Sequence, residues 1–144
     1  MTALVPRPAL VLGWAGVLPF AGLTACRVLR LGLPFDPTPA LLGYAAAILS
    51  FMAGVQWGFT VRAPDGSWAG WRGYAVSVLP ALTAWLALLL PPRPGLVVLA
   101  TGFAALLAYD LWTVRHGYAP DWYGRLRLRL TAAVVALLAA AALA

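Results

Sequence analysis

Apolar residues along the chain form five long charge-free runs, separated by short segments that carry arginines and turn-forming residues. The runs are residues 9–26, 37–61, 73–92, 94–109 and 130–144. A helix that crosses a bilayer needs about 20 mostly apolar residues, because the hydrocarbon core is about 30 Å thick and each residue adds about 1.5 Å. The pattern therefore predicts an all-α integral membrane protein, a bundle of five transmembrane helices.

Proline and glycine positions indicate where these helices begin and end. The expected helices cover about residues 8–29, 38–61, 71–90, 95–114 and 121–144, which form a single transmembrane domain over residues 1–144. Pro19 and Pro80 fall inside the first and third of them. Because proline lacks the backbone donor, both helices are expected to bend there. Residues 63–67, Ala-Pro-Asp-Gly-Ser, predict a turn.

The overall composition supports a membrane protein and excludes several other classes. Hydrophobic residues make up 63% of the chain and charged residues 10%, whereas a soluble domain carries roughly 25% charge. The net charge of +6 comes from arginines spread over the breaks, so no nucleic-acid partner is expected. One cysteine, one histidine and no glutamate argue against a disulfide framework and a metal site.

Common catalytic motifs are absent from the sequence. It contains no helical Glu-x-x-His pair, no Gly-x-Ser-x-Gly and no phosphate-binding glycine loop. We therefore expect no enzymatic activity. The segment ending in Cys26 resembles a lipoprotein signal, but Arg27 directly after the cysteine and Pro19 before it favour a retained first helix.

The arginines are distributed unequally between the two expected sides of the membrane. Arg27, Arg30 and Arg93 lie on one side. The other side carries Arg7, Arg62, Arg72, Arg115, Arg125, Arg127 and Arg129. Because loops rich in arginine stay in the cytoplasm, this bias predicts the N-terminus inside and the C-terminus outside.

Asp110 is the only acidic residue inside an expected span. A carboxylate buried in a membrane must pair, reach water or take up a proton. The last charge-free run covers only about 22 Å, so the final helix must begin near Arg125 and bring Arg127 and Arg129 into the boundary zone. Arg125 and Arg129 share a helix face and Arg127 points elsewhere. Which of these two faces turns towards Asp110 is left open by the sequence.

Two interpretations of this polar group stay open. In the first, Asp110 and an arginine form a structural clamp and Gln56 hydrogen-bonds between helices. In the second, Asp110, Gln56, Trp57, Arg62 and a final-helix arginine line a pocket for an anionic or amphipathic ligand, with aromatic walls from Trp14, Tyr44, Trp57 and Trp85. The candidate binding residues are Trp14, Tyr44, Gln56, Trp57, Asp110, Arg127 and Arg129.

Helix association in a membrane depends on small residues that let backbones approach closely. Gly13, Gly16, Gly43, Gly54, Gly58 and Gly102 are the candidates. Gly54 and Gly58 have the Gly-x-x-x-Gly spacing, which favours packing within the chain over a homodimer face.

Three segments resemble a known family. Residues 12–20 (LGWAGVLPF) resemble LGyaGliPF, residues 44–58 (YAAAILSFMAGVQWG) resemble YgavILSFlgGvrWG, and residues 119–131 (APDWYGRLRLRLT) resemble aPpWYprLRlpLT. These patterns are typical of an uncharacterised family of small bacterial inner-membrane proteins, with a domain of unknown function, whose relatives include the mitochondrial transmembrane protein sixty-nine.

The resemblance implies five helices and an inner-membrane location, but no activity. It directs attention to Trp57, Asp110, Trp122 and Arg127. Gln56 stands where the family usually has arginine, so Asp110 is expected to find its partner on the final helix. Asp121 replaces a common proline.

Three functions are consistent with these features. The first is a non-catalytic accessory or assembly factor that binds a membrane-protein partner, or a second copy through Gly54 and Gly58. The alternative is a binder or carrier of a lipid, quinone or tetrapyrrole, by analogy of architecture with the tryptophan-rich sensory proteins. A proton pathway rests on Asp110 alone and is the weakest, because no second acid lies deeper in the membrane.

Overall fold

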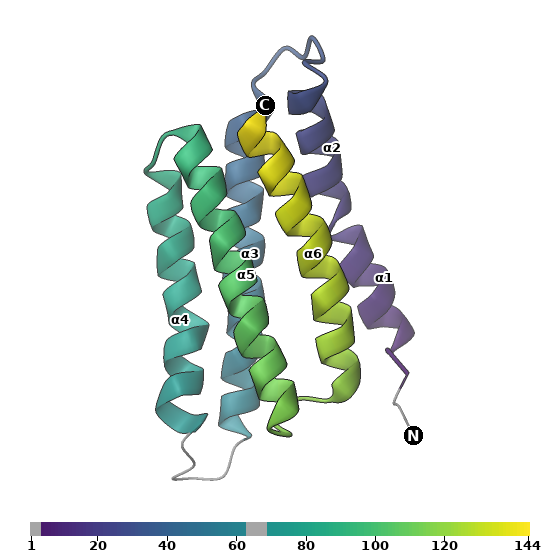
Figure 1. Ribbon diagram of the computed structural model, residues 1–144, viewed down its shortest axis with the longest axis vertical. Coiled ribbons are helices and arrows are strands. Elements are labelled where there is room, and N and C mark those ends of the chain that lie inside the picture. The colour runs from purple at the N-terminus through teal and green to yellow at the C-terminus, as the bar shows by residue number, and fades with distance from the viewer. Residues whose placement is uncertain (1–3, 63–68) are drawn as a thin grey trace.

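The computed structural model describes residues 4–62 and 69–144, and within these residues the chain is helical with no strand. Figure 1 shows the helices running side by side along the long axis of the molecule. The helices are α1 (Arg7–Ala15), α2 (Leu18–Val28), α3 (Pro37–Val61), α4 (Ala69–Leu88), α5 (Pro92–Arg115) and α6 (Asp121–Leu143). The all-α fold expected from the sequence is confirmed. The turn expected at residues 63–67 lies outside the described residues.

The first expected helix consists of two helices, α1 and α2, which meet at Gly16 and Val17. Pro19 lies in the first turn of α2, where its missing backbone donor is tolerated. The carbonyl of Gly16, beside the break, accepts a hydrogen bond from the Tyr44 hydroxyl of α3 at 2.9 Å. The bend expected at Pro19 therefore lies just before it, at Gly16 and Val17, whose backbones keep right-handed helical φ and ψ.

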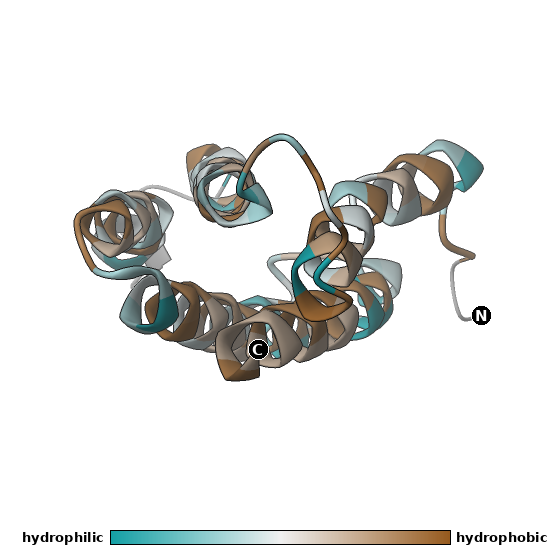
Figure 2. Cartoon of the chain, turned by 90° about the horizontal axis from the view of Figure 1, so that it is seen from above, coloured by the Kyte–Doolittle hydropathy of each residue, from teal (hydrophilic) through white to brown (hydrophobic). Residues whose placement is uncertain are grey.

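Two antiparallel helix pairs, α3 with α4 and α5 with α6, make the largest contacts of the bundle. The α2 helix packs against α3 and α6, and α1 lies against α6 at the edge, where it leads away from the other helices (Figures 1 and 2). The centre of the bundle is filled by large side chains that are fully buried: Phe20, Leu41, Leu49, Leu96, Leu99 and Phe103. The outward faces are also apolar (Figure 2), as expected for helices surrounded by lipid.

Some glycines of the bundle allow two helices to approach closely, but the α3 glycines that were predicted to do so do not. A Cβ on Gly73 of α4 would overlap Thr60 of α3, and a Cβ on Gly102 of α5 would lie 2.8 Å from the Leu49 side chain. Gly54 and Gly58, by contrast, are exposed, and a Cβ there would meet nothing within 4 Å. The same holds for Gly43. The prediction that these α3 glycines pack within the chain is therefore wrong.

Among the described residues, four segments are long and apolar enough to cross a membrane: α1 with α2, then α3, α5 and α6. The α4 helix, which carries Arg72 and Pro80, is not among these four, although it has 20 residues and runs beside them. The α5 helix begins at Pro92 rather than at residue 95, because proline is accommodated in the first turn of a helix. The protein is a membrane protein built as a helical bundle.

Candidate functional site

Asp110 of α5 lies in the interior, between α3 and α6, with 0% of its surface exposed. Its Oδ2 accepts a hydrogen bond from Nε of Arg127 at 2.6 Å, which also forms a salt bridge. Its Oδ1 accepts from Nε2 of Gln56 at 2.5 Å and from the Tyr123 hydroxyl at 3.2 Å. The carboxylate therefore has three donors, from two helices other than its own.

The α6 helix presents Arg127 to the interior and its neighbouring arginines to the outside. Tyr123, Arg127 and Thr131 are spaced four residues apart and so lie on one helix face. Arg127 is 3% exposed, whereas Arg125 and Arg129 are on the exposed side of the helix. The structure thus decides the question that the sequence left open, and Arg127 is the partner of Asp110.

Gln56 extends the network to a second part of α5. Its Oε1 accepts a hydrogen bond from the Thr113 hydroxyl at 3.3 Å, and its backbone carbonyl accepts from Thr60 at 2.8 Å. Since Gln56 is almost completely buried, both ends of its amide have partners inside the protein. The network ties α3, α5 and α6 together through polar contacts, as the clamp interpretation expects.

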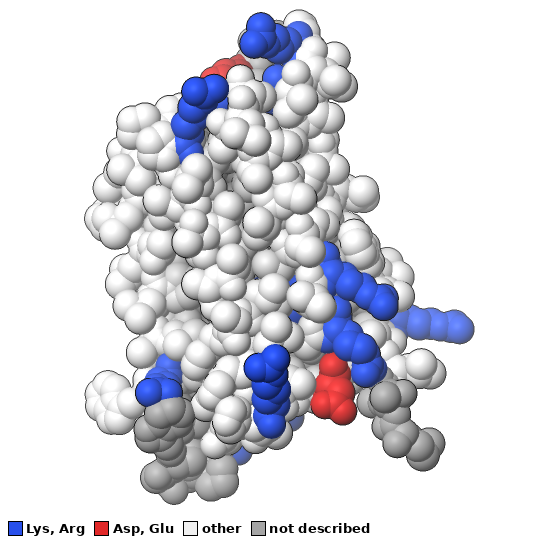
Figure 3. Space-filling view, viewed as in Figure 1, with Lys and Arg blue, Asp and Glu red and all other residues white. Residues whose placement is uncertain are grey.

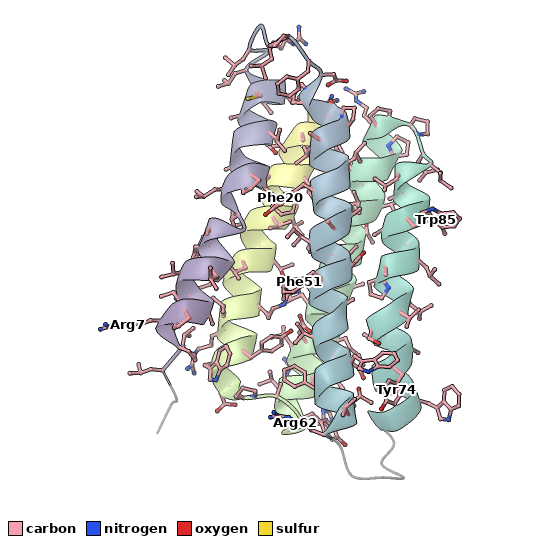
Figure 4. The ribbon with its side chains drawn as sticks, turned by 180° about the vertical axis from the view of Figure 1, so that it is seen from behind. Arg7, Phe20, Phe51, Arg62, Tyr74 and Trp85 are labelled. Carbon is pink, nitrogen blue, oxygen red and sulfur yellow. The ribbon has the colours of Figure 1, made fainter. Side chains whose placement is uncertain are left out.

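A cavity of about 340 Å³ lies beside this network, between the α1–α2 segment, α3 and α6. Its walls are mainly apolar and include Phe20, Ile48, Phe51, Met52, Phe103 and Trp122. Figure 4 shows Phe20 and Phe51 in the region where α2 and α3 face each other. Arg127 and Thr131 line the same cavity from α6 and bring polar groups to an otherwise apolar space.

Two residues that line this cavity each carry a buried polar atom without a hydrogen-bond partner among residues 4–62 and 69–144: Nη2 of Arg127 and Oγ1 of Thr131. Arg127 uses Nε for Asp110, whose Oδ1 is already occupied by Gln56 and Tyr123. An unpaired donor in a dry interior costs about 1–3 kcal/mol. The cavity is therefore suited to a ligand that carries a hydrogen-bond acceptor and an apolar body.

Thr131 differs from several other helical hydroxyl groups of the described bundle. The hydroxyls of Ser50, Thr60, Thr83 and Thr101 each donate to the backbone carbonyl four residues earlier. Such a bond satisfies a hydroxyl within its own helix. Thr131 is equally helical and only 2% exposed, yet no such bond is made.

The aromatic pocket expected from the sequence is not formed. Trp57 is 49% exposed and its ring contacts Tyr74 of α4, with centroids 4.7 Å apart, on a face that points away from Asp110. Trp14 and Trp85 are exposed on other helices, and Figure 4 shows Trp85 pointing outward. Tyr44 contacts Phe20 instead. Gln56 and Trp57 are about 100° apart around α3, and it is Gln56, 1% exposed, that faces the interior.

The remaining predicted residues separate into two groups. Asp110, Gln56 and Arg127 are brought together, whereas Arg129 is exposed and Arg62 lies exposed at the end of α3 (Figure 4). Sequence reasoning did not single out Tyr123 or Thr131. Their four-residue spacing from Arg127 is the signal that places them on the same face once Arg127 is known to turn inward.

A larger cavity of about 530 Å³ lies between α4 and α5. Its lining is apolar except for Thr83, Thr101 and Tyr109. Both threonine hydroxyls donate to carbonyls of their own helices, at 3.0 and 2.8 Å. This groove offers apolar contact without an unpaired donor from either threonine.

Comparison with known proteins gives a family but no activity. The model of the family "Protein of unknown function (DUF3429)" matches residues 5–143. Transmembrane protein 69 of Xenopus tropicalis is 37% identical over 134 residues, which are 90% of this chain and 51% of that protein. Transmembrane protein 69 of Mus musculus is 29% identical over 127 residues, 85% of this chain and 50% of that protein. The chain thus spans about half the length of these relatives. No solved structure matches.

Proposed function

We propose that this protein, which belongs to the DUF3429 family of proteins of unknown function, holds a small amphipathic molecule inside the membrane. The binding site is the cavity between the α1–α2 segment, α3 and α6. The observation that carries the proposal is that two of its lining residues, Arg127 and Thr131, each keep a buried polar atom, Nη2 and Oγ1, without a partner among the described residues. The protein acts as a binder or carrier, without catalysis.

The size and chemistry of the cavity support this role. Ligand sites are concave, mostly apolar and about 300–1,000 Å³ in volume, with a few placed polar groups. The cavity volume of about 340 Å³ lies within this range. Its aromatic and aliphatic walls suit an apolar tail, and the two polar atoms suit a head group. The Asp110–Arg127 pair supports the site by holding the arginine in place.

The same proposal includes a topology of five spans, with the N-terminus in the cytoplasm and the C-terminus outside a bacterial inner membrane. Figure 3 shows more arginine surface at the end where α3 ends and α6 begins than at the opposite end. This distribution favours the arginine-rich end inside. In the proposed topology Arg127 lies in the cytoplasmic half of the bilayer, and α4 is the fifth span, packed against α3 and α5.

Gentle purification from native membranes followed by native mass spectrometry tests the binding function. We expect the wild-type protein to carry about one small molecule per chain. Met52→Trp, which fills the cavity without touching Arg127 or Thr131, removes it. Val98→Trp, at a half-buried residue that lines only the larger cavity, is the matched control and leaves it bound.

Two results would contradict the proposal: wild-type protein without any retained small molecule, or equal retention in both tryptophan variants. Correct folding of each variant is checked by its elution from a sizing column and by its helical circular dichroism.

An accessory or assembly role is the second candidate, favoured by the outward face of α3. Gly43, Ala47, Gly54 and Gly58 are exposed there, and small residues allow a transmembrane helix of another membrane protein to approach closely. A protein partner that co-purifies with the wild-type chain and is lost in the Gly54→Leu, Gly58→Leu double variant supports this role. A second copy of the chain in its place indicates a homodimer, and an unaltered set of co-purified proteins rejects it.

A further inference from the structure

We infer that the ligand is electrically neutral and that its head group is a carbonyl oxygen carried on an apolar body. This inference rests on the proposed function, since it names the chemistry of the molecule that the same cavity takes. It narrows the ligand classes expected from the sequence, because it disfavours fatty-acid anions and tetrapyrroles that carry free carboxylates.

The charge balance of the site gives the first argument. Arg127 is the only charged residue that lines the cavity, and its charge is already balanced by the fully buried Asp110 at 2.6 Å. A buried carboxylate–guanidinium pair is neutral as a unit. An anionic head group would add an uncompensated negative charge close to Asp110 in a medium of low dielectric constant, which is costly. A neutral head group avoids that cost.

The donor and acceptor inventory gives the second argument. A guanidinium nitrogen can donate but cannot accept, and a threonine hydroxyl can do both. Nη2 of Arg127 therefore requires an acceptor, and Thr131 can donate to the same atom because the two residues are one helical turn apart. A carbonyl oxygen has two lone pairs and brings no donor of its own, so it satisfies both groups at once.

The surroundings of this pair fit the rest of such a molecule. Phe20 and Phe103 are fully buried against each other, with ring centroids 6.0 Å apart, and both line the cavity beyond the polar atoms. Ile48 and Met52 of α3 add aliphatic wall. A ring or an acyl chain attached to the carbonyl gains apolar contact here. Two membrane components share this chemistry: a quinone and the ester of an acyl lipid.

Matched probes test the charge of the head group. The full-length protein in an uncharged detergent is titrated with methyl dodecanoate and with dodecanoate, at about pH 9, far above the carboxyl pKa of about 4. Binding is followed by native mass spectrometry. The two probes share one tail and differ in charge. We expect the ester to bind at least tenfold more tightly than the anion.

The position of the head group is tested with ester labelled with carbon-13 at its carbonyl. Hydrogen bonding by the protein lowers the infrared stretching frequency of that carbonyl. Thr131→Val leaves the ion pair intact and is expected to reduce the shift and to weaken ester binding about three- to tenfold. Thr101→Val, whose hydroxyl is bonded to Val97 in the larger cavity, is the control and changes neither.

A short-chain ubiquinone and a short-chain diacylglycerol, titrated in the same way, distinguish the two sources of the carbonyl. The tighter of the two probes identifies the class, and either supports the inference. Anion binding equal to or tighter than ester binding overturns the neutral head group but leaves the binding function in place. An unchanged carbonyl frequency in Thr131→Val overturns the head-group position. If no probe binds the wild-type protein, and no molecule is retained from the membrane, the proposed function itself fails.

Discussion

Two cavities of the described bundle differ in polar character, and the unpaired polar groups belong to the smaller of them. The larger, about 530 Å³ between α4 and α5, has threonine hydroxyls that are satisfied by their own helices. The smaller, about 340 Å³ beside α6, holds a guanidinium nitrogen and a hydroxyl without partners among the described residues. In a membrane, lipid chains can fill any apolar groove, so volume alone does not indicate a specific ligand. Unpaired buried donors do, because lipid tails cannot satisfy them.

Within α6 alone, some polar groups have partners inside the protein and others have none among the described residues. Tyr123 and Arg127 Nε of α6 are used by Asp110. Nη2 of Arg127, and the hydroxyl of Thr131 one turn further along, have no partner among the described residues. The clamp and the binding interpretations are therefore compatible, since the clamp holds Arg127 where its free nitrogen meets the cavity.

Removing the charge of Arg127 is expected to have the largest effect. Arg127→Met leaves Asp110 buried without its cation, which destabilises the protein by about 3–5 kcal/mol. Thermal unfolding in detergent measures the loss. Adding Asp110→Asn should recover most of it, because asparagine keeps an oxygen for Gln56 and Tyr123 without the charge. Wild-type stability in Arg127→Met alone would show that the ion pair does not support the cavity.

Arg27, near the end of α2, connects that helix to α6 and α3. Its Nε donates to the Ala141 carbonyl of α6 at 2.8 Å, and its Nη1 donates to the Thr38 hydroxyl of α3. Arg27→Met should destabilise the protein by about 1.5–3 kcal/mol, the range for hydrogen bonds to charged groups. Arg30→Met, at an exposed position nearby, is the control and should change stability little. Equal losses in both variants would argue against the contact.

Thr131→Val sharpens the comparison between the cavities in protein stripped of bound molecules. The substitution removes a buried hydroxyl without a partner, so it should stabilise this form by about 1 kcal/mol. Thr101→Val, which removes a satisfied and exposed hydroxyl of the larger cavity, should change stability by less than about 0.5 kcal/mol. A loss of stability in Thr131→Val would mean that its hydroxyl is already bonded within the protein.

The smallest expected effect lies at the start of α3. Hydrogen bonds from the side chain and the backbone of Thr38 lower the pKa of Asp36, the N-cap residue. A lowered folded-state pKa gives stability that is present above the unfolded pKa of about 4 and is lost as the pH falls through the folded value. Unfolding temperature should therefore drop slightly below about pH 4. Asp36→Asn keeps a good cap and should flatten this dependence, while both cavities stay unaffected.

Much of the bundle could be predicted from the sequence, because long apolar runs and proline positions depend only on local chemistry. Asp110, Gln56 and an arginine of the final helix could also be selected as a group, since a buried acid requires partners. The direction in which each side chain points from its helix was harder to predict from the sequence. Trp57 follows Gln56 directly, and nothing in their order indicates which of the two faces the core. The glycines of α3 show the same difficulty, because a small residue suits both inward and outward contacts.

The sequence by itself determined that this protein is an all-α membrane protein with a single buried acid, because these properties follow from hydrophobic length and the cost of an unpaired charge. Only the tertiary structure decided that Arg127, rather than Arg125 or Arg129, meets that acid. It also decided that Arg127 and Thr131, which keep unpaired buried atoms, line a cavity. These features depend on the rotation of α6 about its own axis, which is set by packing against α2, α3 and α5 rather than by any local run of residues.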